Sequence, residues 1–146
     1  MGLPQTMSLL TTIKRKFFYD EMEDVRAFYE KFKQPMSSIP TQDLATPERM
    51  QERIDFMQEE LDEFKQGAQT RDMALMADSL IDLVYVVKGT AIEMGLPWEE
   101  LWQDVQRANM AKVIGQTKRG IKIDVTKPPG WKGPETEAIL YHKMEK

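Results

Sequence analysis

The chain contains no cysteine, and His142 is the single histidine among its 146 residues. The absence of cysteine excludes disulfides, thiolate metal sites and cysteine nucleophiles. One histidine near the C-terminus argues against a Ser-His-Asp mechanism and against a ferritin-like di-iron site, which needs two Glu-x-x-His motifs. A metal site built from carboxylates alone would favour hard ions, and we expect Mg²⁺, with Mn²⁺ as the second choice.

The chain also lacks an uninterrupted apolar run long enough to cross a membrane, and no segment resembles a signal peptide. Its length suits one domain, and 41% hydrophobic with 30% charged residues is typical of an ordered globular protein. The formal net charge of -4 argues against stable nucleic-acid binding. We therefore expect a cytoplasmic protein without a membrane partner.

Charge is unevenly distributed along the chain. Residues 48–72 carry eight acidic and four basic side chains, whereas residues 112–133 carry six basic side chains and Asp124 as their one acid. An acidic metal site and a basic anion-binding segment would produce this pattern.

Two aspartates lie in the most apolar stretch, from Met73 to Val87. Asp78 and Asp82 are four residues apart and share one face of a helix that is hydrophobic nearly all round, which predicts burial. A buried carboxylate is costly unless it is paired or bound to metal. A buried ion pair with another segment remains open, but metal ligation is the interpretation we favour.

A second acidic cluster, Glu59, Glu60 and Glu63, lies on the preceding predicted helix. Taken alone, this cluster is equally well explained as a solvated acidic face. A short turn separates the two helices, and antiparallel neighbours would bring the glutamates close to Asp78 and Asp82. The combined pattern therefore predicts a site for divalent metal.

Hydrophobic periodicity and capping residues predict helices over about 20–33, 46–67, 72–94 and 97–112. A possible short strand at 121–125 and a last short helix from Pro134 follow. We divide the chain into an N-terminal extension (1–19), a helical catalytic domain (20–114) and a C-terminal basic arm with a short helix (115–146). The predicted fold is all-α, a bundle of four main helices whose third helix needs cover from homo-oligomerisation.

Asn109 and Lys112 fall on the same angular sector as the apolar stripe of the fourth helix. Either Lys112 extends to the surface and Asn109 helps to end the helix, or both line the cleft formed with the carboxylates. In the second case Lys112 would bind phosphate and Asn109 would bind substrate. Lys132, beside Trp131, is the arm residue that we single out as a further phosphate ligand. Other basic residues of the arm are weaker candidates: Lys118, Arg119, Lys122 and Lys127.

The pattern Glu59-Glu60-x-x-Glu63, followed by Asp82-Leu-Val-Tyr on an apolar helix, resembles the all-α nucleoside triphosphate pyrophosphohydrolase superfamily. That superfamily includes MazG, dimeric dUTPases and phosphoribosyl-ATP pyrophosphohydrolase. The runs 86–91, 95–97, 105–112 and 130–140 are similar to the MazG-like branch of bacteria and phages. The resemblance covers residues 25–140.

The resemblance implies that Glu60, Glu63 and Asp82 bind Mg²⁺ and that Glu59 is a further ligand or the base, so that the glutamates are the catalytic residues. Ser79 occupies the position where the superfamily has a glutamate, and we expect Asp78 to substitute for it. The number of metal ions stays open. The implied oligomer is a homodimer or a homotetramer built as a dimer of dimers. The implied location is the cytoplasm of a bacterium or of a phage-infected host.

The implied reaction is water attack between the α and β phosphates of a nucleoside triphosphate, releasing a monophosphate and pyrophosphate, in control of the nucleotide pool. We expect deoxynucleotides to be preferred over phosphoribosyl-ATP. Two other functions remain open: a non-catalytic helical module whose acidic face docks a basic partner, and a sensor that binds metal or nucleotide without turnover.

Overall fold

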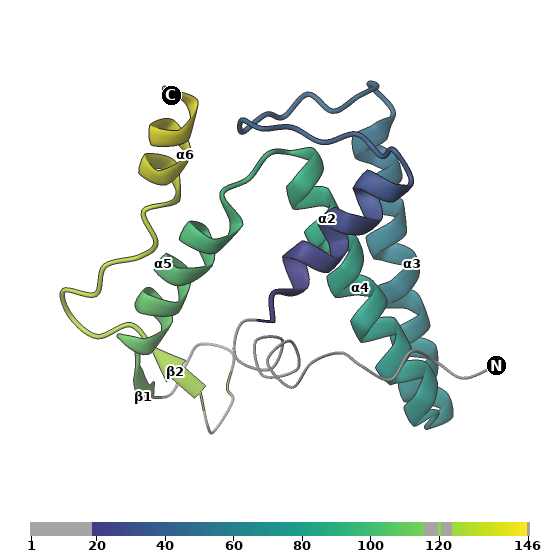
Figure 1. Cartoon of the computed structure of the whole chain (residues 1–146). Coiled ribbons are helices and arrows are strands. Elements are labelled where there is room, and N and C mark those ends of the chain that lie inside the picture. Colours follow the sequence, from purple (N-terminus) through teal and green to yellow (C-terminus); the bar gives the residue numbers. More distant parts are fainter. Residues whose placement is uncertain (1–18, 116–119, 121–123, 146) are drawn as a thin grey trace, which may run out of the picture. The chain divides into compact units, whose positions relative to one another are not determined.

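The computed structural model describes residues 19–115, 120 and 124–145 (Figure 1). This part of the chain is mostly helical with one small sheet, which confirms the predicted all-α class. Its elements are α2 (Glu21–Lys31), α3 (Arg49–Thr70), α4 (Met73–Glu93), α5 (Trp98–Met110), β1 (Val113–Gly115), β2 (Asp124–Thr126) and α6 (Thr136–Met144). The extension up to residue 18 and the candidate ligands Lys118, Arg119 and Lys122 lie outside the described residues.

Helix ends follow local chemistry. Asp20 caps α2, because its side chain accepts a hydrogen bond from the Met22 backbone N–H at 2.8 Å. The helix predicted to end at Gly67 continues to Thr70, and Gly67 is buried within it. Gly95 follows α4 with φ of 62°, and a Cβ there would lie 2.2 Å from the carbonyl oxygen of Ile39, so glycine is required.

The small sheet differs from the sequence prediction. Of the expected strand at 121–125, residues 121–123 lie outside the described residues. The structure describes a strand at Asp124–Thr126, which pairs antiparallel with Val113–Gly115, for which no strand was predicted. Three-residue strands show too little alternation to be recognised, and β1 follows α5 after only two residues. Pairing across the hairpin defines both strands.

The chain forms two compact units. The first contains the described part of Met1–Pro35 together with Arg53–Gly89, and the second contains Met36–Glu52 together with Thr90–Lys146. Each unit is described by itself below.

In the first unit, α3 and α4 pack antiparallel (Figure 1). Arg53 Nη2 donates a hydrogen bond to the Val86 carbonyl oxygen at 2.8 Å near one end of the pair. Near the other end, Gly67 approaches Met76 so closely that an added Cβ would lie 2.8 Å from its Cγ. These contacts fix the register in which residues of α3 and α4 face one another.

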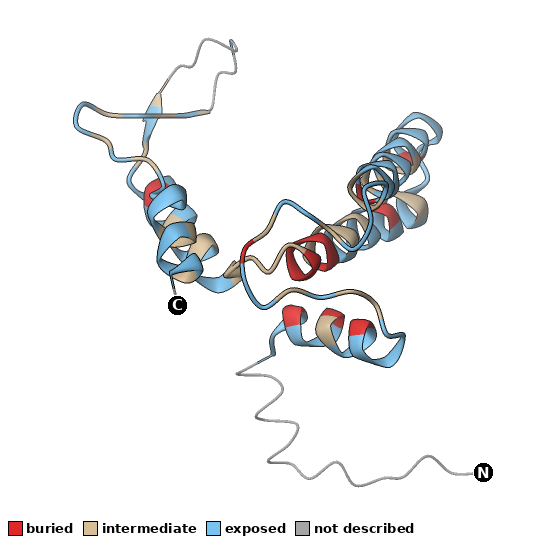
Figure 2. Ribbon diagram, turned by 90° about the horizontal axis from the view of Figure 1, so that it is seen from above, coloured by how far each residue is buried: buried red, intermediate tan, exposed pale blue. Residues whose placement is uncertain are grey.

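Helix α2 supplies most of the core of the first unit. Its buried residues, Met22, Val25 and Tyr29, occur along one side of the helix (Figure 2). An added Cβ at Gly89 of α4 would lie 2.5 Å from Tyr29 Oη and 3.0 Å from Arg53 Nη2. Gly89 is therefore the point where α2, α3 and α4 converge.

One side of α4 remains exposed, although the sequence predicts a helix buried nearly all round. The exposed side chains include Leu80, Ile81, Val84 and Tyr85, and both Asp78 and Asp82 are exposed as well. Within this unit α2 and α3 cover only part of the helix surface. None of the described helices has the length and apolar character needed to cross a membrane.

In the second unit, the start of α3 is tied to the end of α4. Arg49 donates two hydrogen bonds to the carboxylate of Glu93, Nε to Oε2 at 2.9 Å and Nη2 to Oε1 at 2.8 Å. This carboxylate is buried, so the bidentate pair compensates its charge. Later in the unit, α6 packs on α5, where Lys143 Nζ and Glu100 Oε1 form an ion pair at 2.6 Å.

Candidate functional site

The carboxylates predicted to bind metal belong to α3 and α4 of the first unit. The antiparallel register places Glu60 opposite Asp82. Burial raises the pKa of Glu60, and the negative charges of Asp82, Glu63 and Glu59 raise it further. The structure thus brings four of the five predicted carboxylates into electrostatic contact.

Of these four carboxylates, Glu60 has the environment that is least favourable to a negative charge. Its Oε2 atom is buried and has no hydrogen-bond partner among the described residues. An unpaired buried carboxylate oxygen is rare in folded proteins, because losing hydration without replacement is costly. The oxygen is thus poised to accept a proton or bind a cation.

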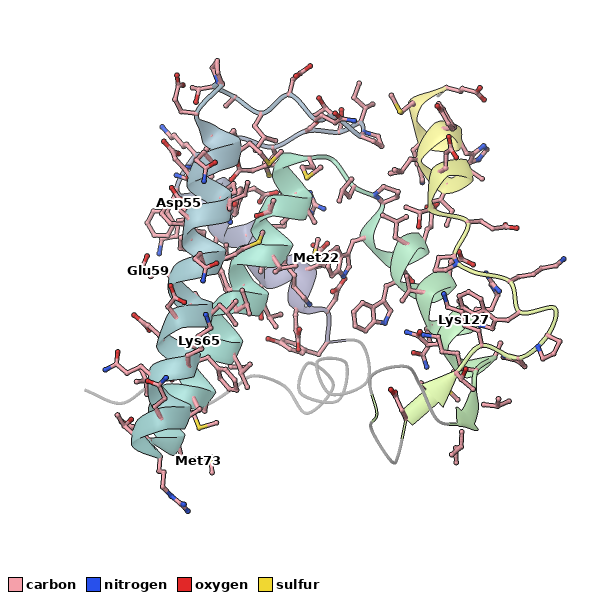
Figure 3. All side chains as sticks on the ribbon, turned by 180° about the vertical axis from the view of Figure 1, so that it is seen from behind. Met22, Asp55, Glu59, Lys65, Met73 and Lys127 are labelled. Carbon is pink, nitrogen blue, oxygen red and sulfur yellow. The ribbon has the colours of Figure 1, made fainter. Side chains whose placement is uncertain are left out.

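The other carboxylates differ in exposure. Glu63 is half-buried, whereas Glu59 is exposed and extends from the side of α3 (Figure 3). Asp78 is exposed, and its charge is not among those that raise the pKa of Glu60. Of the two aspartates, Asp82 is therefore the one whose carboxylate lies near the glutamates of α3.

Ser79 is fully buried on the packed side of α4. Its hydroxyl donates a hydrogen bond of 2.7 Å to the Leu75 carbonyl oxygen one turn earlier. The hydroxyl is thus engaged by its own helix. At the position where the resemblance implies a glutamate, this chain has a small side chain that is hydrogen-bonded to its own helix backbone.

The donor chemistry of the cluster fits a hard divalent cation. As the side chains stand, no three Asp, Glu or His residues of the described part converge closely enough to hold a metal ion. Glu60, Glu63 and Asp82 nevertheless supply oxygen ligands only, and the orphaned Oε2 of Glu60 lies among negative charges. A cation would compensate that atom and the mutual repulsion together.

The predicted substrate ligands belong to the second unit. Asn109 is exposed at the end of α5 and Lys112 is half-buried just beyond it, and Lys112 Nζ donates a hydrogen bond to Asn109 Oδ1 at 2.8 Å. Lys132 is exposed. The lysine that lies over the Trp131 ring from the arm is Lys127, with Nζ 4.7 Å from the ring centroid (Figure 3).

The sequence favours Lys132 over Lys127 as a phosphate ligand, because Lys132 is adjacent to Trp131 in the chain. The turn at Pro128–Pro129–Gly130 explains the difference, since Trp131 N–H donates to the Pro128 carbonyl oxygen at 3.0 Å and folds the chain back. A Pro-Pro-Gly sequence is the signal that indicates such a reversal.

A family model described as phosphoribosyl-ATP pyrophosphohydrolase matches residues 25–109, more than half of the chain. The match runs from within α2 into α5 and includes the carboxylates of α3 and α4. No curated relative matches the chain at a significant level. The chain belongs to the phosphoribosyl-ATP pyrophosphohydrolase family, a group of pyrophosphohydrolases within the all-α nucleoside triphosphate pyrophosphohydrolase superfamily.

Proposed function

We propose that the protein is a Mg²⁺-dependent nucleoside triphosphate pyrophosphohydrolase of the MazG-like branch. It would convert a nucleoside or deoxynucleoside triphosphate to the monophosphate and pyrophosphate. Family membership supports the class of reaction. The observation that carries the site is the buried, unpaired Oε2 of Glu60 among the charges of Asp82, Glu63 and Glu59.

In this proposal Glu60, Glu63 and Asp82 hold Mg²⁺, and Asp78 adds a ligand from the same helix. The metal supplies charge neutralisation to the phosphates and to the leaving pyrophosphate. Glu59, which is exposed to solvent and is not among the ligands in this proposal, takes the proton from the attacking water. The water oxygen bonds to the α phosphorus, the bridge from the α to the β phosphate breaks, and its electron pair leaves with pyrophosphate.

The proposed substrate is a deoxynucleoside triphosphate, and the proposed role is control of the nucleotide pool. Phosphoribosyl-ATP, the substrate in the description of the matching family, is the principal competitor. Phosphoribosyl-ATP has a phosphoribosyl group on its base and a ribose 2′-hydroxyl, which a deoxynucleoside triphosphate lacks, and both contain the phosphoanhydride that is cleaved. A direct comparison of both in one assay separates them.

We also propose that the protein is a homodimer or a dimer of dimers. The exposed side of α4 supports this, because Leu80, Ile81, Val84 and Tyr85 form an apolar surface on a helix of the candidate site. Contiguous apolar surface of this kind is typical of an interaction site, and a second copy offers the same apolar surface.

Pyrophosphate release from a panel of ribo-, deoxy- and modified nucleoside triphosphates and phosphoribosyl-ATP, with Mg²⁺ or Mn²⁺, tests the function. Asp82→Asn should reduce turnover by at least about a hundredfold, which corresponds to roughly 3 kcal/mol of transition-state stabilisation. Asp62→Asn is the matched control, because Asp62 is an exposed aspartate of α3 that pairs with Lys65 at 3.1 Å. Equal activity of the two variants would refute the assigned site.

The panel also separates the other two functions. A sensor would bind nucleotide in calorimetry without releasing pyrophosphate. A helical interaction module would bind neither metal nor nucleotide, and its folding and partner binding would survive substitution of Glu60 and Asp82. Silence across the panel with wild-type protein would eliminate the proposed enzyme.

A further inference from the structure

Two lysines from different segments of the second unit lie over one indole ring. Lys112, which precedes β1, has Nζ 5.7 Å from the Trp131 ring centroid. Lys127, which follows β2, has Nζ 4.7 Å from the same centroid. The hairpin of β1 and β2 brings the two lysines, separated by fifteen positions in the chain, to Trp131.

Trp131 is fixed on α5 by hydrogen bonds on the ring and on its neighbours. Its Nε1 donates to the carbonyl oxygen of buried Ala108 at 2.7 Å. Arg107 Nη2 donates to the Gly133 carbonyl oxygen at 3.0 Å. The backbone N–H of Glu135 donates to Asp104 Oδ2 at 2.6 Å. The ring is therefore held on α5, and both ammonium groups lie within cation–π distance of it.

The positive charges of Lys112 and Lys127 are not neutralised by a carboxylate of the described part of the chain. Lys112 donates to the neutral Asn109 amide, and no described carboxylate forms an ion pair with Lys112 or Lys127. Nearby Asp104 is engaged, since Arg107 Nε lies 2.7 Å from its Oδ1. Arg107 and the Glu135 N–H both lower the pKa of Asp104, which keeps this carboxylate ionised and occupied.

We propose that Trp131 positions Lys112 and Lys127 as a binding site for a polyphosphate anion. Each ammonium over the ring keeps N–H donors directed away from it, and two such groups suit an anion with several charged oxygens. Trp131 acts as a positioning residue, whereas Lys112 and Lys127 contact the anion.

Inorganic tripolyphosphate with the full-length protein tests the site without turnover. The probe is titrated in EDTA, so that metal-dependent binding is removed, and the ¹⁵N–¹H signals of the three tryptophan indoles are followed. Trp131→Phe identifies the Trp131 signal. We expect this signal to shift saturably, and we expect the Lys112→Gln/Lys127→Gln variant to lose affinity by about tenfold or more, since hydrogen bonds to charged groups are the strong ones.

Lys31→Gln is the matched control, because Lys31 Nζ lies 5.2 Å from the centroid of the Phe32 ring and belongs to the first unit. Its affinity should equal that of wild type. An unmoved Trp131 signal, or a shift retained in the double-lysine variant, would overturn the proposal even if nucleotides are hydrolysed. A lysine-dependent shift in a protein that hydrolyses no nucleotide would uphold the anion site and reject the proposed enzymatic function.

Discussion

Glu60 of α3 lies opposite Asp82 of α4, near enough for the charge of Asp82 to raise the pKa of Glu60 above its ordinary value of 4.5. Burial makes the largest contribution to this shift, and Glu63 and Glu59 add to it. The folded state therefore binds a proton at Glu60 more tightly than the unfolded state does. The stability from this group is present below pH 4.5 and is lost as pH rises through the raised pKa.

Glu60→Gln should stabilise the metal-free protein at neutral pH. The substitution removes an i,i+3 repulsion with Glu63, worth about 0.2–0.5 kcal/mol, and also the repulsion with Asp82. We expect Tm to rise by roughly 1–2 °C at pH 7.5 in EDTA. The gain should shrink as pH falls through the raised pKa of Glu60, because the wild-type side chain then takes up its proton. Thermal unfolding at several pH values measures both effects.

Asp62 provides a comparison of opposite sign on the same helix. A hydrogen bond from Lys65 lowers the pKa of Asp62, so its stabilising contribution is present above pH 3.8 and is lost as pH falls through the lowered pKa. Asp62→Asn should therefore leave Tm unchanged or slightly lower at pH 7.5. A rise in Tm as large as that of Glu60→Gln would mean that removing any negative charge from α3 raises Tm, and that the carboxylate cluster is not the cause.

Mg²⁺ should raise the Tm of the wild-type protein through the carboxylate cluster. At a free metal concentration ten times the Kd, binding to the folded state adds about 1.4 kcal/mol, or roughly 3–6 °C. Asp82→Asn should remove most of this increase, and Asp62→Asn should keep it. Differential scanning fluorimetry with Mg²⁺ and with Ca²⁺ gives the measurement. Equal increases in both variants would place the metal elsewhere.

Much of the fold and of the carboxylate cluster was predictable because it depends on short-range spacing. The apolar periodicity gave the five helices to within a few residues, and i,i+3 and i,i+4 positions gave the glutamate cluster. The short turn between α3 and α4 then indicates antiparallel packing. The opposition of Glu60 and Asp82 follows from that packing.

Features that depend on long-range contacts were not predictable from spacing. Arg53 is buried and donates to the carbonyl oxygen of Val86, a residue 33 positions away in the chain. The approach of Lys127 to Trp131 depends on the hairpin and on the turn that follows it. Neither contact leaves a local pattern, because its partners lie on separate segments.

Gly89→Ala should destabilise the protein by about 1–3 kcal/mol, although alanine has the higher helix propensity. The added Cβ would meet Tyr29 Oη at 2.5 Å and Arg53 Nη2 at 3.0 Å, so the side chains of Tyr29 and Arg53 would have to shift from their packed positions. Urea unfolding measures the loss. The same substitution in a Tyr29→Phe background should cost less, because the nearest atom is then absent. An equal cost in both backgrounds would show that the Tyr29 hydroxyl is not the obstacle.

Ile81→Asp should convert the proposed oligomer to a monomer. Ile81 is 68% exposed on α4 and lies beside the exposed Leu80, Val84 and Tyr85, so covering it with a second copy would remove apolar area from water at the centre of the patch. A charge placed there would have to be buried without a partner. Met73→Asp is the control, since Met73 is 77% exposed at the start of the same helix. Size-exclusion chromatography with light scattering should give a dimer or tetramer for wild type and Met73→Asp and a monomer for Ile81→Asp. A monomeric wild type, or an unchanged mass for Ile81→Asp, would exclude this face of α4 as the interface.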